Sequence, residues 1–401
     1  MSHQNIVNNL AIKTESKIVF IVLDGIGGHP LTPTGKTELE TARTPNLNKL
    51  ASVSILGLSN PIAPGITPGS GPGHLGLFGY DPLKCNIGRG VLAALGIGFP
   101  LRTSDIAARI NFCTANSKGI ITDRRAGRIS TSLCTRLAKD LNKIKIKGVE
   151  IFVRPVRDHR ASLIIRGKNF GGDISDSDPQ KVGMKSKPLI GKDIDSKRTI
   201  KIVNQFVLKA QQILSVKKPA NMVLLRGFAK YQRFPSIKEI YKLNSACIAV
   251  YPMYKGVARL VGMETLEGAE TLDDEITVLK KNFNAHDFFF LHVKKTDSAG
   301  EDGNFKQKVK VIEDFDKKLS KILQLKPDVV VITGDHSTPS ILKSHSWHPV
   351  PLLIYSKYCR ADAAKKFGET DCLRGGLGII NATDIMTLAM ANALKLEKFG
   401  A

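Results

Sequence analysis

Cysteine and aromatic residues are scarce in this chain of 401 residues, which holds six Cys, one Trp and only 6% aromatics. The cysteines are widely separated and form no CxxC pair, which disfavours a cysteine zinc site and a disulfide scaffold. The few aromatic side chains also disfavour a single-strand nucleic-acid binder, because such proteins stack bases on aromatic platforms. We therefore expect free, mostly buried thiols rather than disulfides at Cys85, Cys113, Cys134, Cys247, Cys359 and Cys372.

Long hydrophobic runs are lacking too. The longest early apolar run, residues 18–23, is far too short to span a bilayer, which takes about 20 helical residues. The N-terminal stretch MSHQNIVNNLAIKTES has no basic segment followed by about 7 to 15 apolar residues, as a signal peptide would have. We therefore expect a cytoplasmic protein with no membrane partner. The chain has no internal repeat, which excludes the solenoid classes.

Acidic residues are outnumbered by basic ones. Lys and Arg total 59 against 36 Asp and Glu, which gives a formal net charge of +23. Such a balance suits nucleic acid, an anionic membrane face or small phosphorylated acids. Because the basic residues are spread along the chain with few aromatics between them, we favour a generally basic surface and expect no specific nucleic acid.

Strand and helix patterns alternate in the outer parts of the chain. Buried-strand patterns occur at residues 17–25, 287–297, 328–336 and 349–356, and a helical pattern covers residues 305–323. β-branched runs of this kind are typical of parallel strands that are buried on both faces. The alternation predicts an α/β fold with a mostly parallel sheet covered by helices on both faces.

The middle of the chain has a different pattern. Strands with period-two alternation, such as residues 108–115 and 161–167, are separated by short helices and by many Gly, Asp and Lys residues. A chain of this length is expected to form two domains or one domain with an insertion. We predict a core of residues 1–85 and 200–401 and an inserted α+β domain of residues 86–199. A helix at 197–214 and a strand at 221–227 are expected to resume the core.

Three acidic residues stand where apolar strand patterns stop: Asp24, Asp297 and Asp335. Ligands of parallel sheets bind beyond the carboxyl ends of the strands, so these residues are expected to converge. His336 follows one of them directly and His345 lies nearby. Carboxylates mixed with imidazoles are ligands that Mn²⁺, Zn²⁺ or Mg²⁺ would take, so the set predicts a pair of divalent cations.

Ser70 lies in a glycine-rich segment, residues 66–82, between Gly69 and Gly71. The glycines permit a tight turn that would expose the Ser70 hydroxyl, although a helix N-cap that opens a helix near His74 is an equally plain interpretation. The segment has neither the Lys-Ser/Thr pair of a P-loop nor a GxSxG motif. A divalent cation can activate a serine hydroxyl, and two cations suit phosphoryl transfer.

Ten blocks, in order along most of the chain, match one known family. They are VLDGIGG (22–28), ELETARTPNLNKLA (38–51), TPGSGPGHLGLFGYDP (67–82), DRRAGRI (123–129), DHRASLIIRG (158–167), NMVLLRG (221–227), YPMYKGVARLVGM (251–263), HVKKTDSAGEDG (292–303), TGDHSTP (333–339) and HSWHPVP (345–351). Through these blocks the chain resembles the archaeal-type cofactor-independent phosphoglycerate mutases of the alkaline phosphatase superfamily. The resemblance implies an alkaline phosphatase-like core.

The resemblance also implies two divalent metal ions and no organic cofactor. One ion would be held by Asp24, Ser70, Asp335 and His336. The second would be held by Asp297, His345 and the residue four positions after Asp297, where the family usually has His and this chain has Glu301. Glutamate favours Mn²⁺ or Mg²⁺, with Zn²⁺ or Co²⁺ as alternatives.

The implied reaction is the interconversion of 3-phosphoglycerate and 2-phosphoglycerate, with Ser70 carrying the phosphoryl group as phosphoserine. The substrate is thus a small phosphorylated acid, and the inserted domain would be the lid. The matching blocks imply substrate contacts by Asp123, Arg124, His159, Arg160, Arg226 and Lys255.

Two other functions stay open at this point. Glu301 departs from the family pattern, and so does the GPG that begins at Gly71, where archaeal members often carry other small polar residues. Both departures leave room for a two-metal serine phosphotransferase or phosphatase that acts on another small phosphorylated compound. A basic binding or scaffold protein with a decayed site is disfavoured, because the ligand positions keep coordinating residues.

Overall fold

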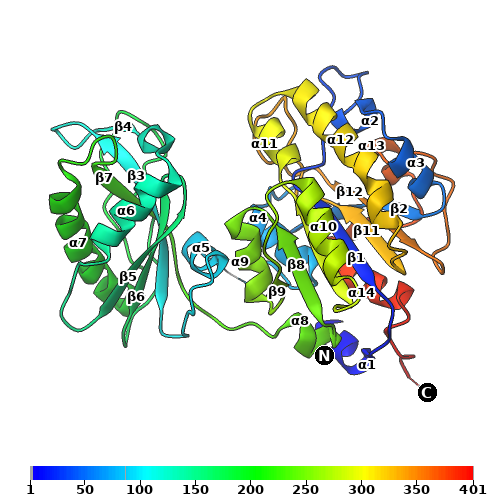
Figure 1. Ribbon diagram of the computed structural model, residues 1–401, viewed down its shortest axis with the longest axis horizontal. Coiled ribbons are helices and arrows are strands. Elements are labelled where there is room, and N and C mark those ends of the chain that lie inside the picture. Colours follow the sequence, from blue (N-terminus) through cyan, green and yellow to red (C-terminus); the bar gives the residue numbers. More distant parts are fainter. Residues whose placement is uncertain (1–2, 86, 401) are drawn as a thin grey trace. The chain divides into compact units, whose positions relative to one another are not determined.

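The computed structural model describes residues 3–85 and 87–400, which form two compact units (Figure 1). The core unit consists of residues up to 85, 235–251 and 261–400. The insert unit consists of residues 87–234 and 252–260. The chain therefore enters the insert unit twice, and its first return to the core comes at residue 235 rather than at about 200.

The core unit is built on an eight-stranded sheet in the order β13-β2-β12-β11-β1-β10-β8-β9. Its α/β class confirms the prediction from the strand patterns. Neighbouring strands are parallel except at β12, which is antiparallel to both β11 and β2. The strands are β1 (Ile18–Leu23), β2 (Ile55–Asn60), β8 (Ser245–Ala249), β9 (Glu264–Thr265), β10 (Phe288–Val293), β11 (Val329–Thr333), β12 (Val350–Ser356) and β13 (Gly378–Asn381).

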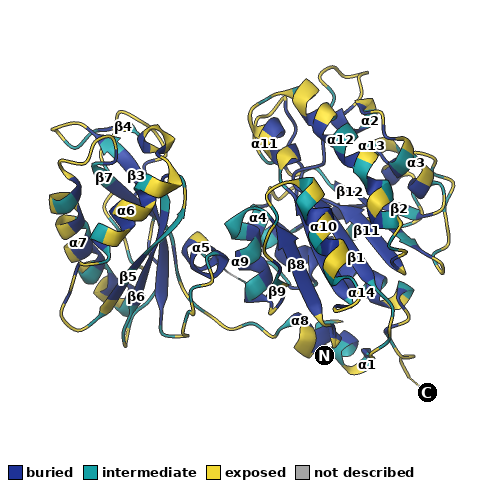
Figure 2. Ribbon diagram, viewed as in Figure 1, coloured by how far each residue is buried: buried dark blue, intermediate teal, exposed yellow. Residues whose placement is uncertain are grey.

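Helices cover both faces of this sheet, so its central strands are buried (Figure 2). On one face, Val19 and Ile21 of β1 belong to a core cluster with Phe315 and Leu319 of α12. On the other face, the Phe290 ring centroid lies 5.0 Å from that of Phe78, the C-cap residue of α4. The helices are α1 (His3–Leu10), α2 (Glu38–Thr41), α3 (Pro45–Ala51), α4 (Ser70–Leu77), α8 (Ile237–Tyr241), α10 (Leu272–Asn282), α11 (Lys295–Glu301), α12 (Phe305–Leu323), α13 (Glu369–Leu373) and α14 (Ala382–Asn392).

The insert unit is a five-stranded antiparallel sheet in the order β4-β3-β6-β5, with β7 also paired to β3. Helices α6 and α7 supply Leu137 and Phe206 to its core. Its elements are α5 (Arg89–Gly96), β3 (Ile106–Ala115), β4 (Ile121–Asp123), a 3₁₀ turn (Ala126–Arg128), α6 (Thr131–Leu141), β5 (Glu150–Arg157), β6 (Arg160–Arg166), α7 (Ile194–Leu214), β7 (Met222–Lys230) and α9 (Pro252–Leu260).

The expected boundary at residue 199 differs from this division for a physical reason. Strand β7 pairs with β3, with Leu225 opposite Ile110, and the apolar side of α7 is buried in the insert core. Both elements therefore belong to the insert unit. The second chain segment of the insert unit is α9. It packs on α5 so closely that a Cβ on Gly256 would lie 2.1 Å from the Leu92 carbonyl oxygen.

Net charge is divided very unevenly between the two units. The insert unit holds 32 of the 59 Lys and Arg residues but only 10 of the 36 Asp and Glu residues. Its formal net charge is thus +22, which leaves +1 for the core unit. The basic excess of the chain is a property of the insert unit alone.

The cysteines are free and mostly buried, as expected. All six cysteines are thiols, and Cys113, Cys134, Cys247 and Cys372 are buried. None of the helices in residues 3–85 and 87–400 has the length and apolar content that a bilayer crossing requires.

Asp316 joins α12 to the start of α3. Its two carboxylate oxygens accept hydrogen bonds from the backbone N–H groups of Leu47 (2.7 Å) and Asn46 (3.2 Å). The N-cap residue of α3, Thr44, makes no side-chain capping bond, so Asp316 performs that role from another helix. The carboxylate is 1% exposed.

We expect Asp316→Ala to lower the free energy of unfolding of the core unit by about 2 to 4 kcal/mol, because it leaves buried N–H donors without an acceptor. Asp314→Ala removes an exposed carboxylate of the same helix and is expected to change it by less than about 0.5 kcal/mol. Urea unfolding followed by circular dichroism measures both. Equal effects would contradict the capping role.

Candidate metal centre

Four acidic and imidazole side chains converge at the carboxyl ends of β1, β10 and β11. Asp24 directly follows β1, and Asp335 and His336 follow β11 after one residue. Asp297 departs from its expected position, because β10 ends at Val293 and Asp297 is the third residue of α11. All four are at most 1% exposed. The parallel strands end at one edge, which is why residues so distant in sequence meet there.

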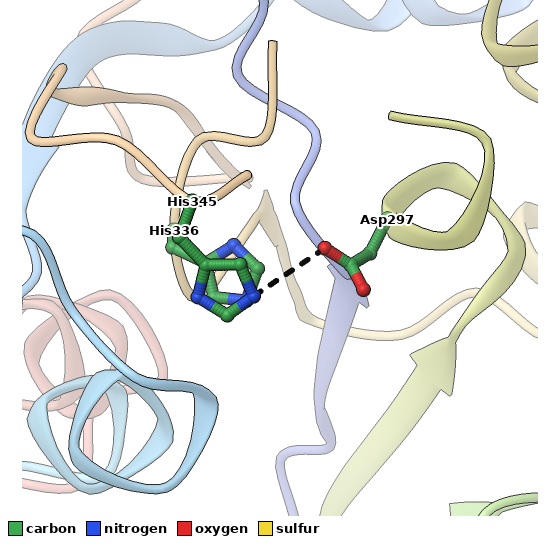
Figure 3. Close-up of side chains that lie close together, drawn as sticks. All are labelled: Asp297, His336 and His345. Atoms are coloured by element: carbon green, nitrogen blue, oxygen red, sulfur yellow. Dashed lines mark ion pairs between the residues drawn. The ribbon is translucent and has the colours of Figure 1, made fainter. Parts of the chain in front are cut away.

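These side chains form two groups of potential metal ligands. Asp24, Asp335 and His336 are one group, and Asp297, His336 and His345 are the other. Within each group the ligand atoms lie within 4.8 Å of one another. Figure 3 shows the His336 and His345 rings, whose centroids are 3.5 Å apart, with the Asp297 carboxylate facing them. Buried carboxylates with imidazole nitrogens are a donor set that fits divalent cations.

Ser70 is the first residue of α4, so the helix starts at the serine and not near His74. Its Oγ lies 3.3 Å from Nε2 of His336, next to the first group. The approach depends on Gly73, where a Cβ would lie 2.2 Å from the Asp335 carbonyl oxygen. His74 Nδ1 lies 2.7 Å from the Ser70 carbonyl oxygen and 3.2 Å from Asp335 Oδ2, so it joins the start of α4 to the acidic group.

Glu301 lies beside the second group but outside it. Its Oε1 is 4.0 Å from Nε2 of His345, and its side chain is 56% exposed. Asp297 Oδ1 is closer to the same nitrogen, at 3.7 Å. Glu301 ends α11, four residues after Asp297, and residues four apart lie on the same face of a helix.

Lys294 is a component of the site that sequence reasoning missed. Its Nζ lies 3.0 Å from Asp24 Oδ2 and also forms an ion pair with Asp297, so one ammonium bridges the two ligand groups. Burial opposes its charge, but Asp24 and Asp297 raise the pKa of Lys294 above its ordinary value. The available signal was a lysine three residues before Asp297. His292 Nε2 also contacts Asp24 Oδ2, at 3.3 Å.

The buried acids are ionised despite their surroundings. Burial and Asp335 oppose the charge of Asp24, but Lys294 and His292 lower the pKa of Asp24 to about 2. The pKa of Asp335 is likewise lowered by His336 and His74 against the effect of burial. Burial opposes protonation of His336, whereas Asp335 and Asp24 raise the pKa of His336 to about 9. The pocket thus concentrates negative charge that a cation can offset.

The substrate residues expected from the sequence lie in the insert unit, where several have acidic partners. Arg124 forms a bidentate pair with Asp178, at 2.9 and 2.7 Å. Arg226 contacts Asp176 at 3.2 Å and Asp178 at 3.4 Å. Asp178 is 2% exposed, and nothing in its polar loop sequence marked it as the acid that orients two guanidinium groups.

The other expected residues lie on several elements of the same unit. Arg160 lies 3.9 Å from Asp158, and Lys255 lies on α9. Asp123 accepts hydrogen bonds from the backbone of Arg125 and Gly127, so it shapes the turn after β4. His159 is buried, and burial together with nearby arginines lowers the pKa of His159 to about 4.

Comparison with known proteins shows similarity over the whole chain. A family model described as the metalloenzyme superfamily matches residues 16–392. A protein of Thermotoga neapolitana is 51% identical over 403 residues, with 100% of both chains covered. One of Aquifex aeolicus is 50% identical over 99% of this chain and 100% of its own. Both carry the name "Probable 2,3-bisphosphoglycerate-independent phosphoglycerate mutase".

Two solved structures share the fold. A protein from Pyrococcus horikoshii superposes with a TM-score of 0.84 at 33% identity, over 97% of this chain and 100% of its own. The cofactor-independent phosphoglycerate mutase from Thermoplasma acidophilum superposes with a TM-score of 0.68 at 30% identity, over 94% of this chain and 100% of its own.

We expect Mn²⁺ to raise the thermal midpoint of EDTA-treated protein, because a cation that binds the folded acids stabilises the native state by about 2.7 kcal/mol at 100 times its dissociation constant. Asp335→Asn should reduce this Mn²⁺-induced shift. Asp314→Asn, which removes an exposed carboxylate outside both groups, should not. Differential scanning calorimetry measures the shifts, and an unchanged shift in Asp335→Asn would refute the assignment of the acids as ligands.

Proposed function

The chain belongs to the metalloenzyme superfamily, among its 2,3-bisphosphoglycerate-independent phosphoglycerate mutases, and we propose that it interconverts 3-phosphoglycerate and 2-phosphoglycerate through a phosphoserine at Ser70. It is an isomerase of glycolysis and gluconeogenesis. The observation that carries the proposal is the position of the Ser70 hydroxyl, 3.3 Å from His336 Nε2. The chain is also about half identical to its named relatives over its whole length. Six thiols suit the reducing cytoplasm as its location.

Two divalent cations complete the proposed site. Asp24, Ser70, Asp335 and His336 would hold one, and Asp297, Glu301 and His345 the other. The donor types and distances described above support this assignment, and the excess of carboxylates favours Mn²⁺ or Mg²⁺ over Zn²⁺ or Co²⁺. When bound, such ions lower the pKa of the serine hydroxyl and offset the charge of the phosphoryl oxygens.

Ser70 exchanges bonds with the substrate in two steps. First its Oγ forms a bond to phosphorus while the bond from phosphorus to the C3 oxygen of glycerate breaks, and the serine proton ends on that oxygen. The C2 hydroxyl then attacks the phosphoserine, the bond between Oγ and phosphorus breaks, and Ser70 regains a proton. The backbone N–H groups at the start of α4, beside Ser70, and the Lys294 ammonium, 3.0 Å from Asp24, would stabilise the charge of the transferring group.

The insert unit is proposed as the substrate-binding lid. Its Arg124, Arg160 and Arg226 suit the carboxylate and phosphate of the substrate, because a guanidinium binds either group through two hydrogen bonds. Asp178 and Asp176 orient two of them, and the net charge of +22 attracts an anion. Asp123, His159 and Lys255 complete the proposed contacts. Such a lid would exclude water, which would otherwise hydrolyse phosphoserine.

A second candidate is a phosphotransferase or phosphatase that uses the same serine on another small phosphorylated compound. Glu301, in place of the usual histidine and 56% exposed, is the observation that favours it. Release of inorganic phosphate from 3-phosphoglycerate faster than formation of 2-phosphoglycerate would support this candidate against the mutase.

We expect Ser70→Ala to lower kcat of the mutase reaction by roughly 10⁴-fold or more, because it removes the phosphoryl acceptor. An enolase-coupled assay with Mn²⁺ measures turnover, and mass spectrometry of acid-quenched wild-type protein should find phosphate on the Ser70 peptide. Ser215→Ala, on an exposed serine of the insert unit, is the control. Near-normal turnover in Ser70→Ala would rule the proposal out.

We expect kcat/KM to fall about tenfold or more between about 20 mM and 500 mM salt, because screening weakens the attraction of the insert unit for a multiply charged substrate. Replacing exposed insert lysines with Gln should flatten this dependence, whereas the same change in the core unit should not. The insert set is Lys139, Lys143, Lys145 and Lys147, and the core set is Lys326, Lys357, Lys365 and Lys398. Identical salt profiles for the two sets would contradict the role of the insert charge.

A further inference from the structure

The hydroxyl of Thr338 connects the two ligand groups. Thr338 is fully buried in the loop after β11, two residues beyond His336. Its Oγ1 lies 2.8 Å from Asp297 Oδ1 and 2.9 Å from His336 Nδ1. It therefore contacts a proposed ligand of the second cation and the imidazole that both groups share.

Chemistry fixes the direction of these two hydrogen bonds. The hydroxyl of Thr338 has a single proton, and it donates that proton to Asp297 Oδ1. The same oxygen must then accept the proton of His336 Nδ1–H. This leaves Nε2 as the nitrogen that meets a cation, and Nε2 is the atom that faces Asp24 Oδ1 (3.3 Å), Asp335 Oδ2 (3.2 Å) and Ser70 Oγ.

The backbone holds Thr338 in place. Its N–H donates to the Gly27 carbonyl at 3.0 Å, and its own carbonyl accepts a hydrogen bond from the buried Lys308 ammonium at 2.9 Å. Lys308 also donates to Gly27, at 2.9 Å, so one ammonium ties the loop after β1 to the loop after β11. Gly25 approaches so closely that a Cβ there would lie 2.5 Å from Thr338 Oγ1. The hydroxyl is thus fixed by both loops.

We propose that Thr338 is a positioning residue that orients His336 and Asp297 together and so couples the affinities of the two cation sites. The inference rests on the proposed function, since it assumes that these groups bind cations. Residues that hydrogen-bond to metal ligands typically contribute about 10- to 100-fold in metal affinity, because they fix the ligand orientation and the histidine tautomer. A threonine that serves two sites at once extends that contribution to both.

The test compares Mn²⁺ binding to the metal-free full-length protein, measured by electron paramagnetic resonance of unbound Mn²⁺. Thr338→Val keeps the shape and removes the hydroxyl, and we expect it to raise both Mn²⁺ dissociation constants by about 10- to 100-fold. Thr338→Ser restores the hydroxyl and should return both to within about threefold of wild type. Thr333→Val is the matched control, because that buried hydroxyl donates to the Pro351 carbonyl at 2.9 Å and not to a proposed ligand, so its loss should leave Mn²⁺ affinity unchanged.

The outcomes separate this inference from the proposed function. Wild-type Mn²⁺ affinity in folded Thr338→Val would overturn the role of Thr338 while mutase turnover still supports the function. Thr338→Ala replaces Thr338→Val if the latter does not fold, as judged by circular dichroism. Weakening at one site only would overturn the coupling. Wild-type protein that binds no Mn²⁺ and has no mutase turnover would overturn the proposed function and this inference with it.

Discussion

Two carboxylates buried side by side are the constraint around which the core unit is organised. Asp24 and Asp335 are fully buried, yet both are ionised. Burial of like charges is costly unless positive charge is close. Lys294 and His336 supply it, and the His292 and His74 rings contact the same carboxylates, so three segments of the chain surround the pair. A divalent cation among the same oxygens would serve the same electrostatic need while adding the chemistry that a phosphoryl group requires.

The fold meets this constraint by bringing strand ends together. β1 lies between β10 and β11 in parallel register, so the residues that follow each strand share one edge of the sheet. Helix α4 reaches the same edge because Gly73 lets its backbone touch that of Asp335. The Lys308 ammonium joins the loops after β1 and β11 by donating to the Gly27 and Thr338 carbonyls, both at 2.9 Å. Rigid strands and glycine contacts together place a hydroxyl beside the acids.

Sequence alone was enough for what depends on local pattern. Hydrophobic periodicity predicted the buried strands and the bounds of α12. The convergence of Asp24, Asp335 and His336 followed because ligands of parallel sheets bind beyond the carboxyl ends of the strands. It failed for what depends on non-local pairing. The alternation of β7 is the same whichever sheet it joins, and only its pairing to β3 shows that it belongs to the insert unit. Lys294 and Asp178 were missed similarly, because a lysine or an aspartate acquires its role from partners that sequence spacing does not reveal.

The double entry of the chain into the insert unit has a consequence for how the two units can be separated. Residues 87–234 form most of the unit, but α9 comes from a later segment and packs Gly256 directly on α5. Excision of residues 87–234 would leave α9 attached to the core unit, with its buried residues Tyr254 and Val257 exposed to solvent. The excised segment would in turn lose the packing that α9 contributes to the insert unit. The unit is therefore not a module that can be removed as one continuous segment. A recombinant insert unit needs α9 joined to residues 87–234 by an artificial linker. Gain or loss of the whole unit in evolution requires changes at two places in the chain.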